Sequence, residues 1–214
     1  MNAWTEIFTT LAILLNFATS KPPYNTNLKF TKAVNGTFYD PKTKYPASLI
    51  FVNGQFLGQF PTHSSKVRGG IACTKSGYIL VGYFKIVNNK LYFSKTPLLT
   101  DDGLPCDTQF WNEIKWALTG GGLYLFHYKP VRNVHKKENL SQYITKHPKY
   151  SFILVHPDMR TITVGISTKI PPEKLAQKLQ GKYSAMLRLD GGSSTKSFSG
   201  SLPKYTNNAI GITF

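Results

Sequence analysis

After residue 27, the first half of the chain alternates hydrophobic and polar positions with a period of two. Such alternation is typical of strands that bury one face. Asn53-Gly54 supplies the two positive-φ residues that a tight hairpin turn needs. The pattern predicts strands at residues 28–34, 48–52, 55–60, 70–74, 78–84 and 91–93. We expect these segments to form an antiparallel meander.

The second half mixes helical and strand patterns. Asp107 is a typical N-cap, and the helix predicted after it carries Phe110 and Ile114 on one face. Pro171-Pro172 favours the first turn of another helix, which Gly181 ends. The pattern predicts helices at 109–118, 140–145 and 172–180, and strands at 123–126, 150–155, 160–166, 184–189 and 209–214. The expected fold class is α+β, a single domain with a mixed, largely antiparallel sheet and flanking helices.

The N-terminal segment, residues 1–27, has a different character. Its apolar stretch, residues 7–18, is too short and too polar to span a membrane, which takes about 20 apolar residues. The length suits either the core of a signal peptide, with Ala18 and Ser20 before a cut, or a structural N-terminal helix. Residues 20–27 contain two prolines and indicate a linker. We therefore expect residues 28–214 to form the functional domain, with no integral membrane span.

Charge narrows the class of partner. The 214 residues include 26 Lys and Arg against 10 Asp and Glu, a formal net charge of +16. Such a field attracts nucleic acid, anionic membrane surfaces and phosphate-bearing polysaccharides, although it also serves solubility alone. The basic residues are scattered, and no zinc-finger spacing, RNP-type aromatic pattern or identifiable helix-turn-helix is present, so no nucleic acid partner is expected. An anionic carbohydrate or sugar-phosphate substrate is favoured.

Few residues have the spacing of metal ligands. Cys73 and Cys106 can pair as one disulfide in an oxidising compartment or remain two free thiols, and neither belongs to a metal-binding pattern. The five His residues show no HxH or HxxxH spacing. We predict no metal site and no cofactor, and leave open whether a divalent metal assists.

The sharpest chemical motif is Asp190-Gly191-Gly192-Ser193-Ser194. A hydrophobic strand carries Asp190 at its carboxyl end, where a carboxylate can orient a water or a sugar hydroxyl or transfer a proton. The two glycines permit close backbone approach to a ligand, and consecutive N–H groups with the serine hydroxyls can cradle phosphate oxygens. An ordinary Asp-Gly-Gly turn before a serine-rich loop is the alternative that spacing alone leaves open.

This motif resembles the signature of the phosphodiester glycosidase family, which is one glycine longer. Similar family-like stretches occur at residues 33–40 (Ala-Val-Asn-Gly-Thr-Phe-Tyr-Asp), 52–54, 68–72, 120–123 and 207–211. The resemblance covers residues 28–214, in the family's order. It implies a hydrolase that cleaves the bond between a sugar's anomeric carbon and phosphate, or a related glycosidic linkage, in a glycan or wall polymer. It also implies an extracytoplasmic location, secreted or periplasmic, which favours the signal-peptide interpretation.

The resemblance assigns roles residue by residue. Asp190 and Asn35 match the family's carboxylate and its early asparagine, and are the predicted catalytic residues. The predicted substrate-binding residues are Gly191, Gly192, Ser193, Ser194, Arg68, Lys149 and Arg188. Arg188 lies two residues before Asp190, so strand alternation places both on one face. Phe38, Tyr39 and Tyr124 can stack on sugars, although core packing explains most such aromatic residues.

Departures from the family pattern leave a second function open. Many members carry an arginine where this chain has Lys149, which keeps the charge but loses bidentate phosphate geometry. Glycosidases normally use two carboxylates, and besides Asp190 only Asp40 lies in a family-like segment, with Asp158 a weaker third. A phosphodiester leaving group departs as an anion, so one carboxylate with cationic clamps suffices. We expect a phosphodiester glycosidase-like hydrolase, with a catalytically degenerate binding module for anionic glycans as the alternative.

Overall fold

The computed structural model describes residues 4–19, 28–40, 42–43, 45–57, 67–96, 103–201 and 208–213, and the predicted linker at 20–27 lies outside them. These residues build three sheets, in which every strand pairing is antiparallel. The six-stranded sheet has the order β1 (Trp4–Leu11), β14 (Thr161–Ser167), β13 (Tyr150–Val155), β15 (Ala185–Gly191), β11 (Leu123–Phe126), β12 (Lys129–Pro130). The seven-stranded sheet has the order β5 (Gln55–Phe56), β4 (Ile50–Val52), β10 (Ile114–Thr119), β6 (Arg68–Thr74), β7 (Ile79–Val87), β8 (Lys90–Ser94), β9 (Leu104–Pro105). The four-stranded sheet has the order β16 (Ser197–Gly200), β3 (Phe30–Asn35), β17 (Asn208–Ile212), β2 (Asn16–Thr19).

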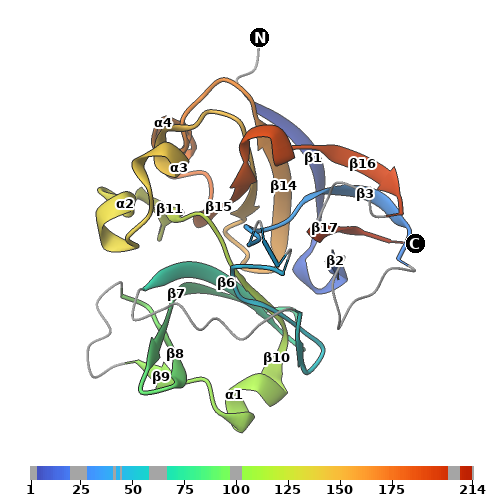
Figure 1. Cartoon of the computed structure of the whole chain (residues 1–214), viewed down its shortest axis with the longest axis vertical. Coiled ribbons are helices and arrows are strands. Elements are labelled where there is room, and N and C mark those ends of the chain that lie inside the picture. The colour runs from blue at the N-terminus through green and yellow to red at the C-terminus, as the bar shows by residue number, and fades with distance from the viewer. Residues whose placement is uncertain are drawn as a thin grey trace.

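The helices are short and few in the described residues. They are α1 (Thr108–Glu113), α2 (Val134–Lys137), α3 (Gln142–Lys146), α4 (Pro172–Leu179) and the 3-10 turns η1 (Ala12–Leu14) and η2 (Gly192–Ser194). Figure 1 shows α2, α3 and α4 grouped beside β11 and β15, while α1 lies at the far end of the seven-stranded sheet. Among these residues, no helix is long and apolar enough to cross a membrane. The predicted α+β class agrees broadly with a fold that is mainly strand, but three antiparallel sheets replace the single mixed sheet.

One hydrophobic cluster joins all three sheets. It contains Phe17 and Ile210 from the four-stranded sheet, Ile153 from the six-stranded sheet, and Ile71 and Trp116 from the seven-stranded sheet. Each sheet has a face in this cluster, so apolar burial holds the three sheets together. The other face of the six-stranded sheet is covered by α4, whose buried side chains follow helical spacing.

The helix predicted at 109–118 is wrong in its second half. Asp107 caps α1 as expected, accepting a hydrogen bond from Phe110 N at 3.0 Å, but the helix ends at Glu113. Residues 114–119 form β10, which pairs with β4 on one side and β6 on the other. Nearly every residue of β10 is buried. A strand buried on both faces loses the alternation that identifies strands, so this apolar run resembled a helix.

The helix interpretation of the N-terminal segment is also wrong. Residues 4–11 form β1, an edge strand paired with β14, and residues 16–19 form β2, paired with β17. Between them, the Ala12 carbonyl accepts a hydrogen bond from Trp116 Nε1 at 2.8 Å. The described part of this segment therefore belongs to sheets that later residues complete. Signal-peptide cleavage stays a prediction.

The remaining elements match the predictions closely. The hairpin at Asn53-Gly54 and the helix from Pro172 are confirmed, and Gly181 takes a φ of +75° just after that helix. The predicted meander holds for β6, β7 and β8, whereas β4 pairs with β10 and β3 lies in the four-stranded sheet. The helix predicted at 140–145 begins two residues later, as α3. The elements α2, β9, β12 and β16 were not predicted, and neither were the two 3-10 turns.

Candidate functional site

Asp190 sits at the carboxyl end of β15, between β13 and β11. Its side chain is 8% exposed, and Oδ1 accepts a hydrogen bond from Gly191 N at 2.7 Å. Its backbone N–H donates to the Gly36 carbonyl at 3.0 Å, which ties the end of β15 to the segment after β3. The structure thus brings together two family-like stretches that lie about 150 residues apart in the sequence, as the resemblance implied.

Asn35 joins three segments around Asp190, and its amide is occupied within the chain. Its Nδ2 donates to the Asp190 carbonyl at 3.3 Å, and its Oδ1 accepts from Lys196 N and from Ser151 Oγ, both at 3.1 Å. Ser151 Oγ also contacts the Asn35 and Asp190 carbonyls. The contacts of Asn35 are those of a positioning residue that fixes the end of β15.

The glycine turn does not present its two N–H groups outward. Gly191 N donates to Asp190 Oδ1, and Gly192 N donates to the Lys149 carbonyl at 2.8 Å. They are therefore not the unengaged donors that a phosphate cradle requires. Gly192 has a φ of +69° and open space where a Cβ would stand, while Ser193 is exposed. The side chain of Ser194 lies outside the described part of the structure.

Arg188 is buried directly behind the turn, where a Cβ at Gly191 would lie 2.6 Å from its Nη2. Its side chain is 1% exposed, and Cζ lies 5.5 Å from the centroid of the Phe38 ring and 5.2 Å from that of Tyr150. Burial lowers the pKa of Arg188, and electrostatic interactions with Tyr124, Asp190 and Tyr150 oppose this shift. Asp190 lies close enough to act electrostatically on Arg188, and the arginine is deeper than a surface cation.

The other predicted cations lie in different surroundings. The half-buried Arg68 donates a hydrogen bond from Nη1 to the Glu138 carbonyl. Lys149 is exposed, and its carbonyl receives Gly192 N, so its backbone flanks the turn. Lys196, also exposed, flanks the turn from the other side through its hydrogen bond to Asn35.

Several buried polar atoms in β15 and in other elements have no hydrogen bond. Native structures leave few such atoms, and each requires an explanation, for example an absent ligand. Among the described residues they belong to Thr37, Tyr124, Tyr150, Arg188, Thr195 and Asn208. All six side chains come from β11, β13, β15, β17 or the segments just after β3 and η2, the elements that converge at the end of β15.

The two other candidate carboxylates, Asp40 and Asp158, stabilise the turns in which they lie. Asp40 Oδ1 accepts hydrogen bonds from Lys42 N and Thr43 N, and these contacts lower the pKa of Asp40. Asp158 does the same for Arg160 N and Thr161 N in the exposed turn between β13 and β14. Neither supplies an evident partner for Asp190.

Sequence reasoning missed Glu138, a buried carboxylate beneath the 120–123 stretch. Its Oε1 accepts from Leu123 N at 2.8 Å and its Oε2 from Gly69 N at 2.7 Å, which links β11 to β6. Burial raises the pKa of Glu138 to about 7. A Cβ at position 69 would lie 2.7 Å from Oε1, so the glycine of this family-like stretch was the one signal available.

Metal ligands do not cluster in the residues that the structure describes, where no group of three or more His, Cys, Asp or Glu could hold an ion. Cys73 and Cys106 are both free thiols.

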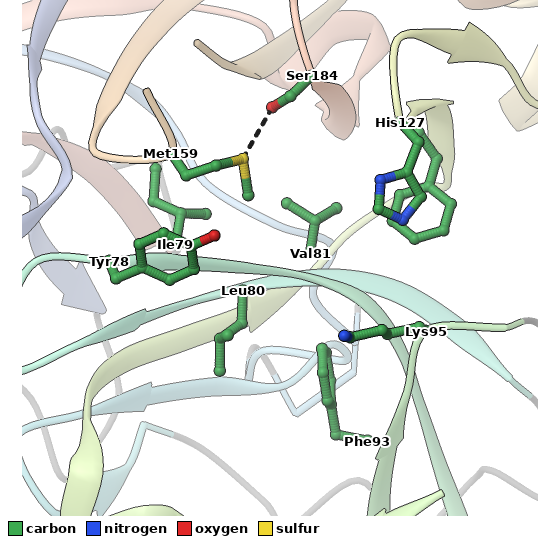
Figure 2. A pocket seen from close by; sticks show the side chains of 10 residues that line it. Tyr78, Ile79, Leu80, Val81, Phe93, Lys95, His127, Met159 and Ser184 are labelled. Atoms are coloured by element: carbon green, nitrogen blue, oxygen red, sulfur yellow. Dashed lines mark hydrogen bonds between the residues drawn. The ribbon is translucent and has the colours of Figure 1, made fainter. Parts of the chain in front are cut away.

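A separate pocket of about 160 Å³ lies beside Ser184, where β15 begins (Figure 2). Six residues of strand, about 20 Å, separate it from Asp190. Figure 2 shows Met159, which accepts a hydrogen bond from Ser184 Oγ at 3.2 Å, facing His127 and Lys95 across an apolar floor. None of the predicted site residues lines this pocket.

Comparison with known proteins gives the fold but no sequence family, since no family model and no curated protein matches the chain. The fold is similar to that of the zebrafish N-acetylglucosamine-1-phosphodiester alpha-N-acetylglucosaminidase (NAGPA) catalytic domain, auto-inhibited by its pro-peptide. The TM-score is 0.60 at 12% identity, covering 98% of this chain and 89% of that one. A hypothetical protein from Synechocystis matches with a TM-score of 0.50 at 16% identity, over 95% of this chain and 56% of that one. The chain thus has a fold similar to that of the NAGPA catalytic domain.

Proposed function

We propose that the chain is a glycosidase-like hydrolase that cleaves a sugar-1-phosphodiester, or a related glycosidic bond, in a glycan or wall polymer. The observation that carries this proposal is the position of Asp190: a nearly buried carboxylate at the end of a central strand, fixed by Asn35 and by the segment after β3. The similarity to an enzyme domain that acts on a sugar phosphodiester supports the same substrate class.

In this proposal Asp190 orients the attacking water. The water oxygen forms a bond to the anomeric carbon while the bond from that carbon to the phosphate oxygen breaks. The electron pair leaves with the phosphate, and the proton of the water passes to Asp190 or to solvent. Because the leaving phosphate is already a stable anion, no second carboxylate is needed to protonate it.

The test is hydrolysis of a panel of chromogenic sugar-1-phosphodiesters by the wild type and by Asp190→Asn, with and without a chelator. We expect the variant to fold normally and to lose turnover. Asp107→Asn is the matched control, because it makes the same change at a helix N-cap, where asparagine serves equally well. A wild-type rate in Asp190→Asn would refute the assignment, and loss of the wild-type rate with chelator would reveal a metal.

A binding module without turnover is the second candidate. The observations that favour it are the exposed Lys149 in place of an arginine and the engaged N–H groups of the glycine turn. It predicts salt-sensitive retention of the protein on an anionic polysaccharide, with no sugar released. Release of sugar by the wild type would exclude it.

An extracytoplasmic location is proposed with either function. Removal of residues 1–20 would take β1 and β2 from their sheets. Intact mass measurement of the protein recovered from each cell fraction would show both where it resides and whether those strands are retained. Recovery only from the cytoplasm would contradict the location.

A further inference from the structure

The guanidinium of Arg188 is a buried cation whose hydrogen-bonding groups are mostly unused. In the part of the chain that the structure describes, its one hydrogen bond runs from Nη1 to the Leu189 carbonyl at 3.1 Å, and no carboxylate pairs with it. Nε is buried and has no acceptor. A buried charge without a partner costs several kcal/mol. The faces of the Phe38 and Tyr150 rings offset part of this cost through cation–π attraction.

Two tyrosine side chains, Tyr124 and Tyr150, lie near Arg188. Both hydroxyls are buried; that of Tyr124 has no hydrogen-bond partner among the described residues, and that of Tyr150 makes no hydrogen bond of normal geometry but lies close to Ser167. Burial raises the pKa of each, so both stay protonated and remain able to donate. The charge of Arg188 acts on both groups, which places them in its surroundings. Arg188 and Tyr124, on the neighbouring strands β15 and β11, therefore both keep donors without an acceptor, whereas the Tyr150 hydroxyl lies on the β14 side of β13.

The glycines beside Arg188 leave room for the guanidinium. A Cβ at Gly121 would lie 2.5 Å from Nη1, and a Cβ at Gly191 would lie 2.6 Å from Nη2. Gly191 therefore brings the turn against the arginine, and its own N–H is already used by Asp190. A side chain at either glycine would occupy the space of the guanidinium.

We propose that Arg188 is the group that recognises a phosphate of the substrate, from inside the fold, with Tyr124 assisting. This inference takes the identity of the substrate from the proposed function, and it specifies which residue binds the phosphate. Planar guanidinium donors match a tetrahedral oxyanion better than an ammonium does. Arg68 is engaged by Glu138, and Lys149 is solvated, so neither matches this geometry. A phosphate seated there lies beside Asp190, where the bond to the anomeric carbon would break.

The test measures binding of inorganic phosphate, not turnover. The wild type, Arg188→Met and Arg132→Met are unfolded thermally over a range of phosphate concentrations at constant ionic strength, with acetate as the reference anion. Arg132 is an exposed arginine distant in sequence from the motif, so its variant removes the same charge. A second measurement, broadening of the phosphorus NMR signal of phosphate by each protein, reports binding without unfolding.

A ligand that binds only the folded state raises Tm in a saturable way. We expect this rise in the wild type and Arg132→Met, and its loss in Arg188→Met. Phosphate also stabilises proteins nonspecifically, but that effect does not saturate and is the same in all three. Without phosphate, Arg188→Met should unfold at or above the wild-type temperature, because it removes an unpaired buried charge.

Two results would overturn the inference. Absence of saturable phosphate binding by the wild type is the first, and retention of that binding by Arg188→Met is the second. A lower Tm of Arg188→Met with unchanged phosphate binding would show that the arginine is only structural. These results are independent of hydrolysis. Phosphate binding without turnover would support the anion site and reject the hydrolase. Turnover without phosphate binding would support the hydrolase and reject the anion site.

Discussion

Replacing Asn35 with alanine tests whether this residue positions the site or contacts the substrate. Its Oδ1 accepts from Lys196 N and Ser151 Oγ, and its Nδ2 donates to the Asp190 carbonyl. In Asn35→Ala, Ser151 Oγ can still donate to two carbonyl oxygens, so losing its hydrogen bond to Asn35 costs little stability. Lys196 N loses its side-chain acceptor at a partly buried position, which costs about 1–3 kcal/mol.

With about 1 kcal/mol more for the hydrogen bond to the Asp190 carbonyl, the total reaches about 2–4 kcal/mol. For a chain of this size, that is a fall in Tm of about 4–16 °C. The assay is thermal and urea unfolding followed by tryptophan fluorescence, since Trp116 is fully buried and reports on the core. Asn112→Ala, on the exposed face of α1, is the control and should stay within about 0.5 kcal/mol of the wild type.

A stable Asn35→Ala variant that loses turnover would refute this reasoning, because it would mean that the amide acts on the substrate. A positioning role instead requires stability and turnover to fall together. It also requires the loss of turnover to appear in kcat more than in KM, since the carboxylate end of β15 moves while the anion-binding side is kept.

Three further predictions concern packing and titration. Gly191→Ala should lower stability by about 1–3 kcal/mol in thermal unfolding, because its Cβ would stand 2.6 Å from the Lys149 carbonyl oxygen; wild-type stability would contradict it. The pKa of Glu138, about 7, lies above its ordinary 4.5, so the folded state holds the proton more tightly. The contribution of Glu138 to the free energy of unfolding should then be greatest below pH 4.5 and fall by about 3 kcal/mol as pH rises through 7. Urea titrations at several pH values should show a weaker pH dependence in Glu138→Gln than in the wild type. Burial raises the pKa of Cys73 to about 11 and of Cys106 to about 12, so neither thiol should react with a disulfide reagent at pH 8 until the protein is denatured.

The sequence predicted best the strands that have one solvent-exposed face or that adjoin a characteristic turn. Asn53-Gly54 located the hairpin of β4 and β5, and both residues have positive φ, as the turn requires. The failure at β10 has a physical cause that does not apply to β1, most of whose residues are not buried. An apolar run shorter than about ten residues carries no period that separates a doubly covered strand from a helix, and only its partners decide. For β10 those partners are β4 and β6, which lie more than 40 residues earlier in the sequence.

The site was predictable where the motif itself carries the chemistry. Strand alternation predicted Arg188 and Asp190 on one face, and the two groups interact electrostatically, while the pairing of β13 with β15 is irregular between them. The depth of Arg188 was not predictable, because the side chains that enclose it come from three separate elements: Phe38, Tyr124 and Tyr150. The hydrogen bonds of the glycine N–H groups could not be predicted from the motif either, since Gly192 N donates to a carbonyl more than 40 residues earlier in the sequence.

Two departures from the family pattern take on a different meaning when they are considered with Arg188. The exposed Lys149 weakens a phosphate clamp at the start of β13, and the shorter glycine run has no spare N–H at Gly191 or Gly192. Taken alone, both favour a degenerate site. In the proposed anion site, Arg188 on the neighbouring strand provides the guanidinium that position 149 lacks, and the absence of a Cβ at Gly191 lets the turn approach it. If the proposed anion site is correct, recognition of the anion depends on the interior of β15 and needs neither the turn's N–H groups nor a cation at position 149.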